Sequence, residues 1–342
     1  VGGGRERTSY ELVGRGGPTN FGSERSMIDS SYLYRGLCGL ARAHLANSMA
    51  GHLGAALLAG CFFADDHADF EAGVYAGVAR DLDRVVAGEE SLWFDARKAG
   101  ITVPELFAPF PREDPVVDGV TPIATALSAN IDGLREAGHN AIFASLAIRA
   151  LVRHPEHATP SIVDGIRRLI ARFDRATPGK GYFGKRKGWI DGHAVTLADD
   201  DPAAFSDERA MVRGVIDELV RTASIRRQGF GGLFHVINHA RAITQLSQTG
   251  QPELAKRGLA PVHHHLRLYR SLPDVEVELG VLVKARHDPR TPEHWGRRDS
   301  LQWSAWLTHR IKTLYAFLDL LPMIDDAETR REAEDAFLYL MA

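Results

Sequence analysis

The feature that most constrains the fold is a helical spacing of apolar residues that recurs along almost the whole chain. Over residues 69–87, Phe70, Val74, Val78 and Leu82 recur at intervals of four, which places them on one face of a helix. No comparable run alternates apolar and polar residues as a half-buried strand does. The same pattern predicts helices over 29–46, 48–64, 69–87, 119–137, 139–153, 160–174, 206–226, 233–249, 252–271, 274–286, 302–322 and 326–341.

These helices predict an all-α fold, arranged as an α/α toroid or as a large orthogonal helical bundle. We expect one domain over residues 27–342, because a hydrophobic content of 44% can supply one large core. Residues 1–26 are rich in Gly, Arg and Ser and predict a flexible arm. Two long loop insertions, at 88–118 and 177–192, are expected to interrupt the helices and to cover a site.

Charge and composition narrow the class of protein. The 41 basic and 44 acidic residues are mixed along the chain and give a net charge of −3, so no nucleic-acid partner is expected. Cys38 and Cys61 lie in apolar surroundings, which argues against a disulfide scaffold or a cysteine zinc site. The most apolar stretch, residues 54–64, is about half as long as a membrane span, so a cytoplasmic location without a membrane partner is expected. Nucleotide-binding and serine-hydrolase motifs are absent from the sequence.

Histidines point to a site inside the helical core. His235 and His239 follow a glycine-rich turn and lie one helical turn apart, so both rings and Asn238 can face one cavity. His139 opens another predicted helix. Imidazole titrates near neutral pH and is the commonest metal ligand, so we predict that His139, His235, Asn238 and His239 are catalytic. The alternative is one buried and one exposed histidine without a catalytic role.

A second interpretation gives the same histidines a metal. His235 and His239 could bind a divalent transition metal together with His265 or with a carboxylate such as Asp66. The result would be a hydrolase, a lyase or an oxygenase with an open coordination position.

Other polar and aromatic residues are candidates for substrate binding. Tyr182 and Arg186 lie in the glycine-rich insertion and are predicted to clamp an anionic group. Trp303 and Lys312 lie near the last long helix and are predicted to line a pocket for an organic substrate. The expected partner is therefore a small molecule.

Three short motifs resemble a known family. The strings His139–Leu151 and Phe234–Ile243, followed by Ile311 and Lys312, resemble the ordered helical histidine motifs of the questin oxidase family. The resemblance spans about residues 44–340, through short motifs alone, and departs from the family at Asn140, where a glycine is usual. That family includes enzymes associated with oxidative ring cleavage of aromatic polyketides, so the resemblance implies an oxidoreductase acting on a small organic substrate.

Three classes of function remain open at this point. The first is an enzyme that uses histidine acid/base chemistry on a small organic substrate, as in oxidative tailoring. The second is the metal-dependent hydrolase or lyase. The third is a helical scaffold that binds a protein, and the absence of an internal repeat counts against it.

Overall fold

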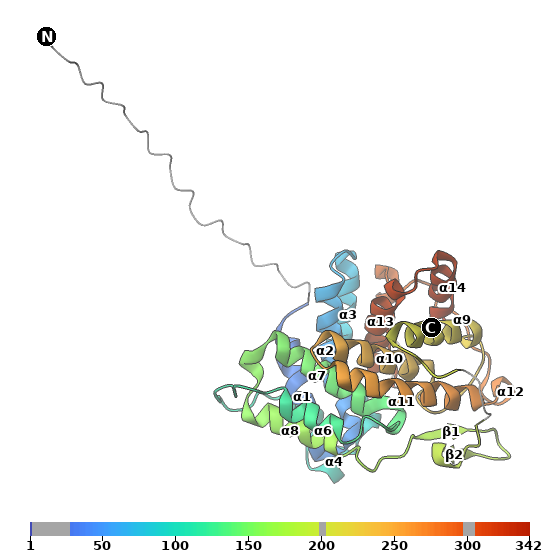
Figure 1. Ribbon diagram of the computed structural model, residues 1–342, viewed down its shortest axis with the longest axis horizontal. Coiled ribbons are helices and arrows are strands. Elements are labelled where there is room, and N and C mark those ends of the chain that lie inside the picture. Colours follow the sequence, from blue (N-terminus) through green and yellow to red (C-terminus); the bar gives the residue numbers. More distant parts are fainter. Residues whose placement is uncertain (2–27, 198–202, 297–304) are drawn as a thin grey trace.

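The computed structural model describes Val1 and residues 28–197, 203–296 and 305–342. Within these residues the chain forms fourteen α-helices and one two-stranded sheet, which confirms the predicted all-α class (Figure 1). The finer choice between a toroid and an orthogonal bundle stays a prediction. The predicted arm lies outside the described residues apart from Val1.

Four inner helices form the centre of the molecule (Figure 1). They are α2 (Gly51–Asp66), α7 (His139–Arg153), α10 (Gly232–Gln248) and α13 (Trp306–Leu320). Each packs against two of the others, in the order α2, α7, α10, α13 and back to α2. Their residues are buried on nearly every side, including polar residues of α7, α10 and α13.

The contacts between the inner helices show that they run in the same direction. His52 near the start of α2 contacts His139 at the start of α7, and Asp66 at the end of α2 pairs with Arg149 late in α7. The helices α10 and α13 are also parallel, because His235 contacts His309 near their starts and Arg241 pairs with Asp319 further along. All four N-termini therefore lie at one end of the core.

Seven outer helices cover this core and return the chain to its starting end. They are α1 (Ser31–Ala46), α3 (Ala72–Val86), α6 (Thr121–Ser128), α8 (Pro160–Ala171), α9 (Glu208–Thr222), α11 (Pro252–Ser271) and α14 (Ala327–Phe337). The helix α8 shows the pattern, because Ile162, Ile166 and Leu169 are buried on one face. The helices α1 and α2 approach closely at Gly54, where an added Cβ atom would lie 2.6 Å from the Gly36 oxygen.

One helical run, Ser48–Asp66, is long and apolar enough to cross a membrane by length and composition. Its 19 residues reach a mean hydropathy of 1.2, but 83% of the most apolar part is buried inside the protein. It contains α2, the central helix of the core.

Both insertions have regular structure of their own. The first was expected to be a loop, yet it contains α4 (Ala96–Ala99) and α5 (Val103–Phe107). A capping box between Thr102 and Glu105 explains α5, because it satisfies free N–H groups at the helix start. The second insertion is a hairpin of β1 (Lys180–Tyr182) and β2 (Trp189–Asp191), in which Gly181 pairs with Ile190.

The predicted helix over 274–286 is wrong. It shortens to α12 (Glu276–Leu279), which ends at Gly280 in a left-handed backbone conformation. The remaining regular segments are 3-10 turns at Ser48–Ala50, Ser91–Trp93, Glu136–Gly138, Pro155–His157, Gly192–Ala194, Pro292–Gly296 and Leu321–Met323.

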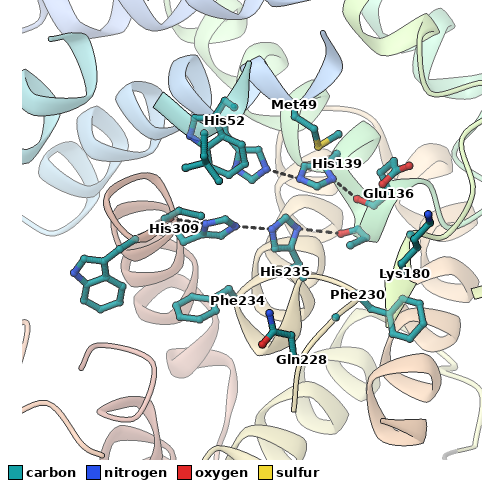
Figure 2. A pocket seen from close by; sticks show the side chains of 18 of the residues that line it. Met49, His52, Glu136, His139, Lys180, Gln228, Phe230, Phe234, His235 and His309 are labelled. Atoms are coloured by element: carbon teal, nitrogen blue, oxygen red, sulfur yellow. Dashed lines mark hydrogen bonds between the residues drawn. The ribbon is translucent and has the colours of Figure 1, made fainter. Parts of the chain in front are cut away.

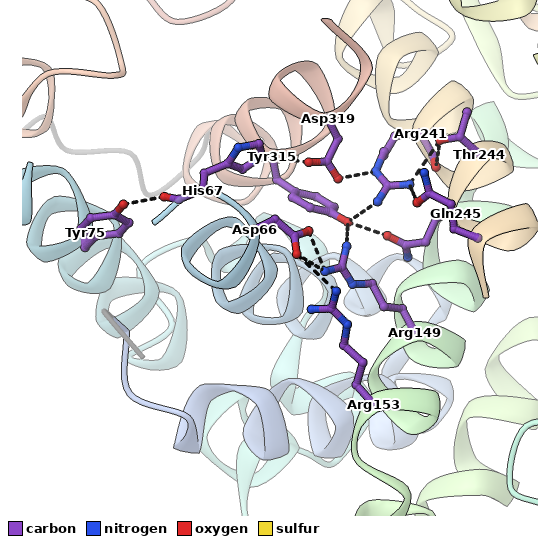
Figure 3. Close-up of polar contacts among 11 residues, drawn as sticks. Asp66, His67, Tyr75, Arg149, Arg153, Arg241, Thr244, Gln245, Tyr315 and Asp319 are labelled. Carbon is purple, nitrogen blue, oxygen red and sulfur yellow. Dashed lines mark hydrogen bonds and ion pairs between the residues drawn. The ribbon is translucent and has the colours of Figure 1, made fainter. Parts of the chain in front are cut away.

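A buried polar network joins all four inner helices away from their N-termini (Figure 3). Arg149 on α7 pairs with Asp66 on α2 at 2.6 Å and donates to the Tyr315 hydroxyl on α13 at 2.6 Å. Arg241 on α10 donates to the same hydroxyl at 2.9 Å and pairs with Asp319 at 2.7 Å. A buried network of this kind fixes the helices relative to one another, because each broken bond would leave a buried charge unpaired.

Candidate functional site

The first turns of the four inner helices meet at a cavity of about 690 Å³ (Figure 2). Each turn contributes one histidine to the cavity wall: His52 on α2, His139 on α7, His235 on α10 and His309 on α13. The first three are buried, and His309 is partly buried. The fold therefore gathers four imidazoles from distant parts of the chain at one place.

The ring nitrogens are close enough to share one cation. His52 Nε2 lies 2.6 Å from His139 Nε2, and His235 Nε2 lies 2.6 Å from His309 Nε2. One ring nitrogen from each of His52, His139 and His235 falls within 4.8 Å of the other two. Imidazole nitrogens in such a set suit Zn, Cu, Fe and Ni.

Main-chain carbonyl groups hold the opposite nitrogen of three rings. The Nδ1 atoms donate from His139 to Glu136, from His235 to Ala137 at 3.3 Å and from His309 to Ala305 at 2.7 Å. A carbonyl oxygen can only accept, so Nδ1 carries the proton of each neutral ring and Nε2 offers a lone pair to the cavity. Metal-binding histidines are almost always oriented by such a hydrogen bond from their other nitrogen.

The His235–His309 pair and the His52–His139 pair differ in their hydrogen bonding. The lone pairs of His235 and His309 face each other, which is repulsive unless a cation lies between them. In the other pair, Lys312 Nζ donates to His52 Nδ1, which leaves His52 Nε2–H free to donate to His139. A proton or a metal ion shared by the two nitrogens would remove the repulsion in the His235–His309 pair.

Strained backbone supplies the carbonyl groups that orient the histidines. Among the described residues, Glu136, Ala137 and Phe230 are the non-glycine residues with positive φ, at 43°, 56° and 47°. Each presents its oxygen to an imidazole; the third, Phe230, accepts from His265 Nε2 at 2.7 Å. Such conformations cost about 1–2 kcal/mol each and cluster at functional sites.

Burial keeps the imidazoles neutral. Desolvation lowers the pKa of His139 to about 3 and holds the pKa values of His52, His235 and His309 well below their usual range. The positive ends of four helix dipoles act in the same direction, because they disfavour a charged ring and favour an anion. Neutral imidazoles with such low pKa values hold a proton poorly, but their lone pairs can still bind a metal ion.

Aromatic side chains form much of the rest of the cavity wall. Trp93 stacks on the His52 ring at 3.9 Å between centroids and 11° between planes. Buried Glu90 holds that wall in place, accepting from Trp93 Nε1 at 3.0 Å and from the Thr308 N–H in the first turn of α13 at 3.3 Å. The other aromatic residues are Trp189, Phe230, Phe234 and Trp306, and the charged ones are Glu136, Lys180 and Arg226. Flat aromatic walls suit a planar organic molecule.

Of the four residues predicted to be catalytic, the structure brings two into the cavity wall, His139 and His235. Asn238 lies beneath it and donates to Phe234 O at 2.7 Å and to Thr313 Oγ1 at 2.9 Å. His239 lies behind the cavity as well, where its Nδ1 is 3.3 Å from Nδ1 of His265.

The structure does not bring together the four residues that were predicted from the sequence to bind a metal. Of His235, His239, His265 and Asp66, only His235 belongs to the group of converging nitrogens in the described residues. His265 is turned to the Phe230 carbonyl, and Asp66 lies in the buried network with Arg149. Helical spacing indicated that His235 and His239 lie close together on α10. It could not show which residues of other helices contact each of them.

The residues predicted to bind substrate are spread more widely. Tyr182 donates to Glu278 at 2.7 Å, and Arg186 is exposed on the hairpin; neither lines the cavity. Trp303 lies outside the described residues. Lys312 is buried beside the cavity, and burial lowers its pKa to about 7.

His52 and His309 were not predicted from the sequence to be site residues. A signal was present, because each histidine of the cavity falls in the first turn of a helix without an obvious polar face. Recognising it requires knowing that these four helices run side by side in one direction.

Comparison with known proteins adds no family: no family model, curated protein or solved structure matches the chain. Function is therefore inferred from the cavity and its residues.

Proposed function

We propose that the chain is an oxidoreductase that holds a transition metal between His52, His139, His235 and His309 and oxidises a planar aromatic molecule bound beside it. The observation that carries the proposal is that the Nε2 atoms of His139, His235 and His309 face one cavity with their lone pairs, while a main-chain carbonyl group holds Nδ1 of each ring. The short motifs that resemble the questin oxidase family support the oxidative chemistry. His139, His235 and Lys312 lie within those motifs.

The residues fit a metal in charge, donor type and orientation. Neutral His139, His235 and His309 need lose no proton to bind it, and each already has the hydrogen bond typical of ligands, whereas His52 would first release its Nε2 proton. A tetrahedral site would separate its nitrogens by about 3.3 Å, given metal–nitrogen bonds of about 2.0–2.1 Å. The 2.6 Å pairs would therefore open by less than an ångström.

A redox-active metal such as iron or copper would supply the chemistry that activates dioxygen. The protein's own groups would place the substrate and hold protons. Trp93 and the other aromatic walls would exclude water and set the plane of the ring. Glu136 lines the cavity, and burial raises its pKa, so it is placed to accept a proton from a substrate hydroxyl.

The same Glu136 favours a second candidate, a metal-dependent hydrolase or lyase. A carboxylate with a raised pKa beside a metal can activate water or remove a proton from a carbon acid. The identity of the metal separates the candidates, because zinc has no redox chemistry.

The first experiment is elemental analysis of the untagged protein by plasma mass spectrometry, beside His235→Ala, His309→Ala and the matched buried control His239→Gln. We expect about one metal ion per chain in the unmodified protein and in the control, and a loss of at least tenfold in both alanine variants. Iron, copper or manganese with oxygen uptake on aromatic phenols supports the oxidoreductase, and zinc supports the hydrolase or lyase. Folded protein that takes up none of these metals, or binds them equally without His309, contradicts the metal site.

A further inference from the structure

A second cavity of about 320 Å³, the side cavity, adjoins the cavity lined by the four histidines, the histidine cavity. Both are lined by the segment that precedes α10 and by its first turn: Arg226, Gln228, Gly229, Gly231 and Phe234. The side cavity also has an apolar part, formed by Ile225, Leu233, Leu282 and Leu340. A molecule bound over the histidines therefore has the side cavity directly beyond one wall.

Arg226 lines both cavities, and its side chain has no polar partner in the part of the chain that the structure describes. Its guanidinium makes no hydrogen bond or ion pair with any described residue, whereas its main-chain oxygen accepts from Val275. An arginine is always charged and offers five donors in a planar fork that fits a carboxylate. A partly buried guanidinium left unpaired on a cavity wall is available to an anionic ligand.

The neighbouring Arg227 adds a second cation, which is only weakly paired with a carboxylate within the described residues. Its Nε and Nη1 atoms are buried and make no hydrogen bond within the described part of the chain, although Nη1 lies 3.5 Å from Glu218 Oε1. That carboxylate is already shared, since Oε2 of Glu218 accepts from Arg221 and, at 2.6 Å, from Arg270. Glu218 is thus shared by three guanidinium groups, and Arg227 has the longest of the three contacts.

We infer that the side cavity binds the carboxylate arm of the substrate, with Arg226 as its main anchor and Arg227 as a supporting charge. The volume and the leucine-rich wall leave room for several methylene groups between the carboxylate and the ring. The substrate class is thus an aromatic acid with an alkyl arm. The inference rests on the proposed function only in placing the aromatic ring in the histidine cavity.

The test measures binding of three probes to the protein as purified, by titration calorimetry: 2-naphthoate, 5-(2-naphthyl)pentanoate and the methyl ester of the latter. A charge-assisted hydrogen bond predicts that the long acid binds about 10 to 100 times more tightly than its ester. The short acid should bind no better than the ester, because its carboxylate cannot reach past the shared wall. Arg226→Gln should remove most of the preference, and folding should be unaffected since Arg226 has no partner in the described residues.

Arg186→Gln is the matched control, because it removes the same charge from the exposed hairpin and should leave all three affinities unchanged. Arg227→Gln should lower the preference by a smaller factor, measured only where its melting curve shows folded protein. Equal binding of acid and ester, or equal losses in Arg226→Gln and Arg186→Gln, would overturn the inference. Neither result depends on metal content or turnover, so failure here is distinguishable from failure of the oxidoreductase proposal.

Discussion

Asp319 shows how a single buried carboxylate is kept charged in this core. It lies between Arg241, 2.7 Å away, and His67, whose Nε2 is 2.8 Å from the other carboxylate oxygen. Burial by itself would raise the pKa of Asp319, but the hydrogen bond with His67 and the charge of Arg241 outweigh it, and the pKa is lowered from 3.8. The charged form is therefore more stable in the folded protein than in the unfolded chain.

Because the folded pKa of Asp319 is the lower one, its contribution to stability is complete above the unfolded value of 3.8 and is lost as the pH falls through the folded value. Asp319→Asn should lower the free energy of unfolding by about 3 kcal/mol at pH 7, since it leaves Arg241 buried without its anion. The difference should shrink steadily below pH 4. Urea denaturation at several pH values measures it.

Asp217→Asn is the control for this prediction, because Asp217 pairs with Arg213 at 2.8 Å on the exposed surface. Its effect should stay below about 1 kcal/mol at every pH. A deficit in Asp319→Asn that does not change with pH would contradict the lowered pKa.

Single residues also show the limit of prediction from the sequence. His139 and His235 were identifiable because helical spacing and glycine-rich turns are local signals. His52 and His309 join them only through packing between helices, and no local pattern shows which helix starts meet. The sequence also gave no sign that Arg226 lines a cavity, because an arginine on a cavity wall and one on the surface look alike in a sequence.

At the scale of elements, the turn before α10 fixes where His235 can lie. Gly231 has φ of 71°, and an added Cβ atom would lie 2.2 Å from Cγ of His235. The neighbouring Gly229 allows its main chain to pass against Gly181 of the hairpin. The turn therefore links the histidine cavity to the β-hairpin.

Gly231→Ala should displace the His235 ring and weaken metal binding by at least tenfold, in addition to the backbone cost of about 1–2 kcal/mol. Gly250→Ala is the matched control, because Gly250 has φ of 81° with nothing within 4 Å of the added atom. Both variants should lose similar backbone stability, and only the first should lose metal affinity, as measured by competition with a chromophoric chelator. Equal affinities would show that the turn does not position the ring.

Elements with strong local signals were predicted well. The helices over 139–153 and 252–271 have the bounds expected from apolar spacing and from the residues at their ends. The failure at 274–286 has a local cause, since Gly280 ends the helix and apolar side chains beyond it are exposed. The short helices in the first insertion were missed because four or five residues carry too little periodicity to detect.

On the scale of the whole molecule, metal binding and folding should be coupled. The ligands come from four helices that meet only in the folded chain, so the unfolded chain has no comparable site. A metal at about 100 times its dissociation constant should stabilise the folded state by about 2.7 kcal/mol. That corresponds to a rise of a few degrees in the melting temperature.

Differential scanning calorimetry with the metal identified by elemental analysis, and then with a chelator in excess, measures this coupling. The His235→Ala/His309→Ala double variant should show neither the rise nor the fall. The same shift in both proteins would mean that the metal acts elsewhere on the molecule.

The carbonyl groups that orient the histidines belong to the main chain, and this affects how the site can change during evolution. No exchange of side chains at Glu136 or Ala137 removes an oxygen that every amino acid carries. Losing one residue from 136–138, in contrast, would shift both acceptors at once and turn two imidazoles away from the cavity. Lineages descending from this chain should therefore conserve the number of residues in this segment more strictly than the side chain at position 137.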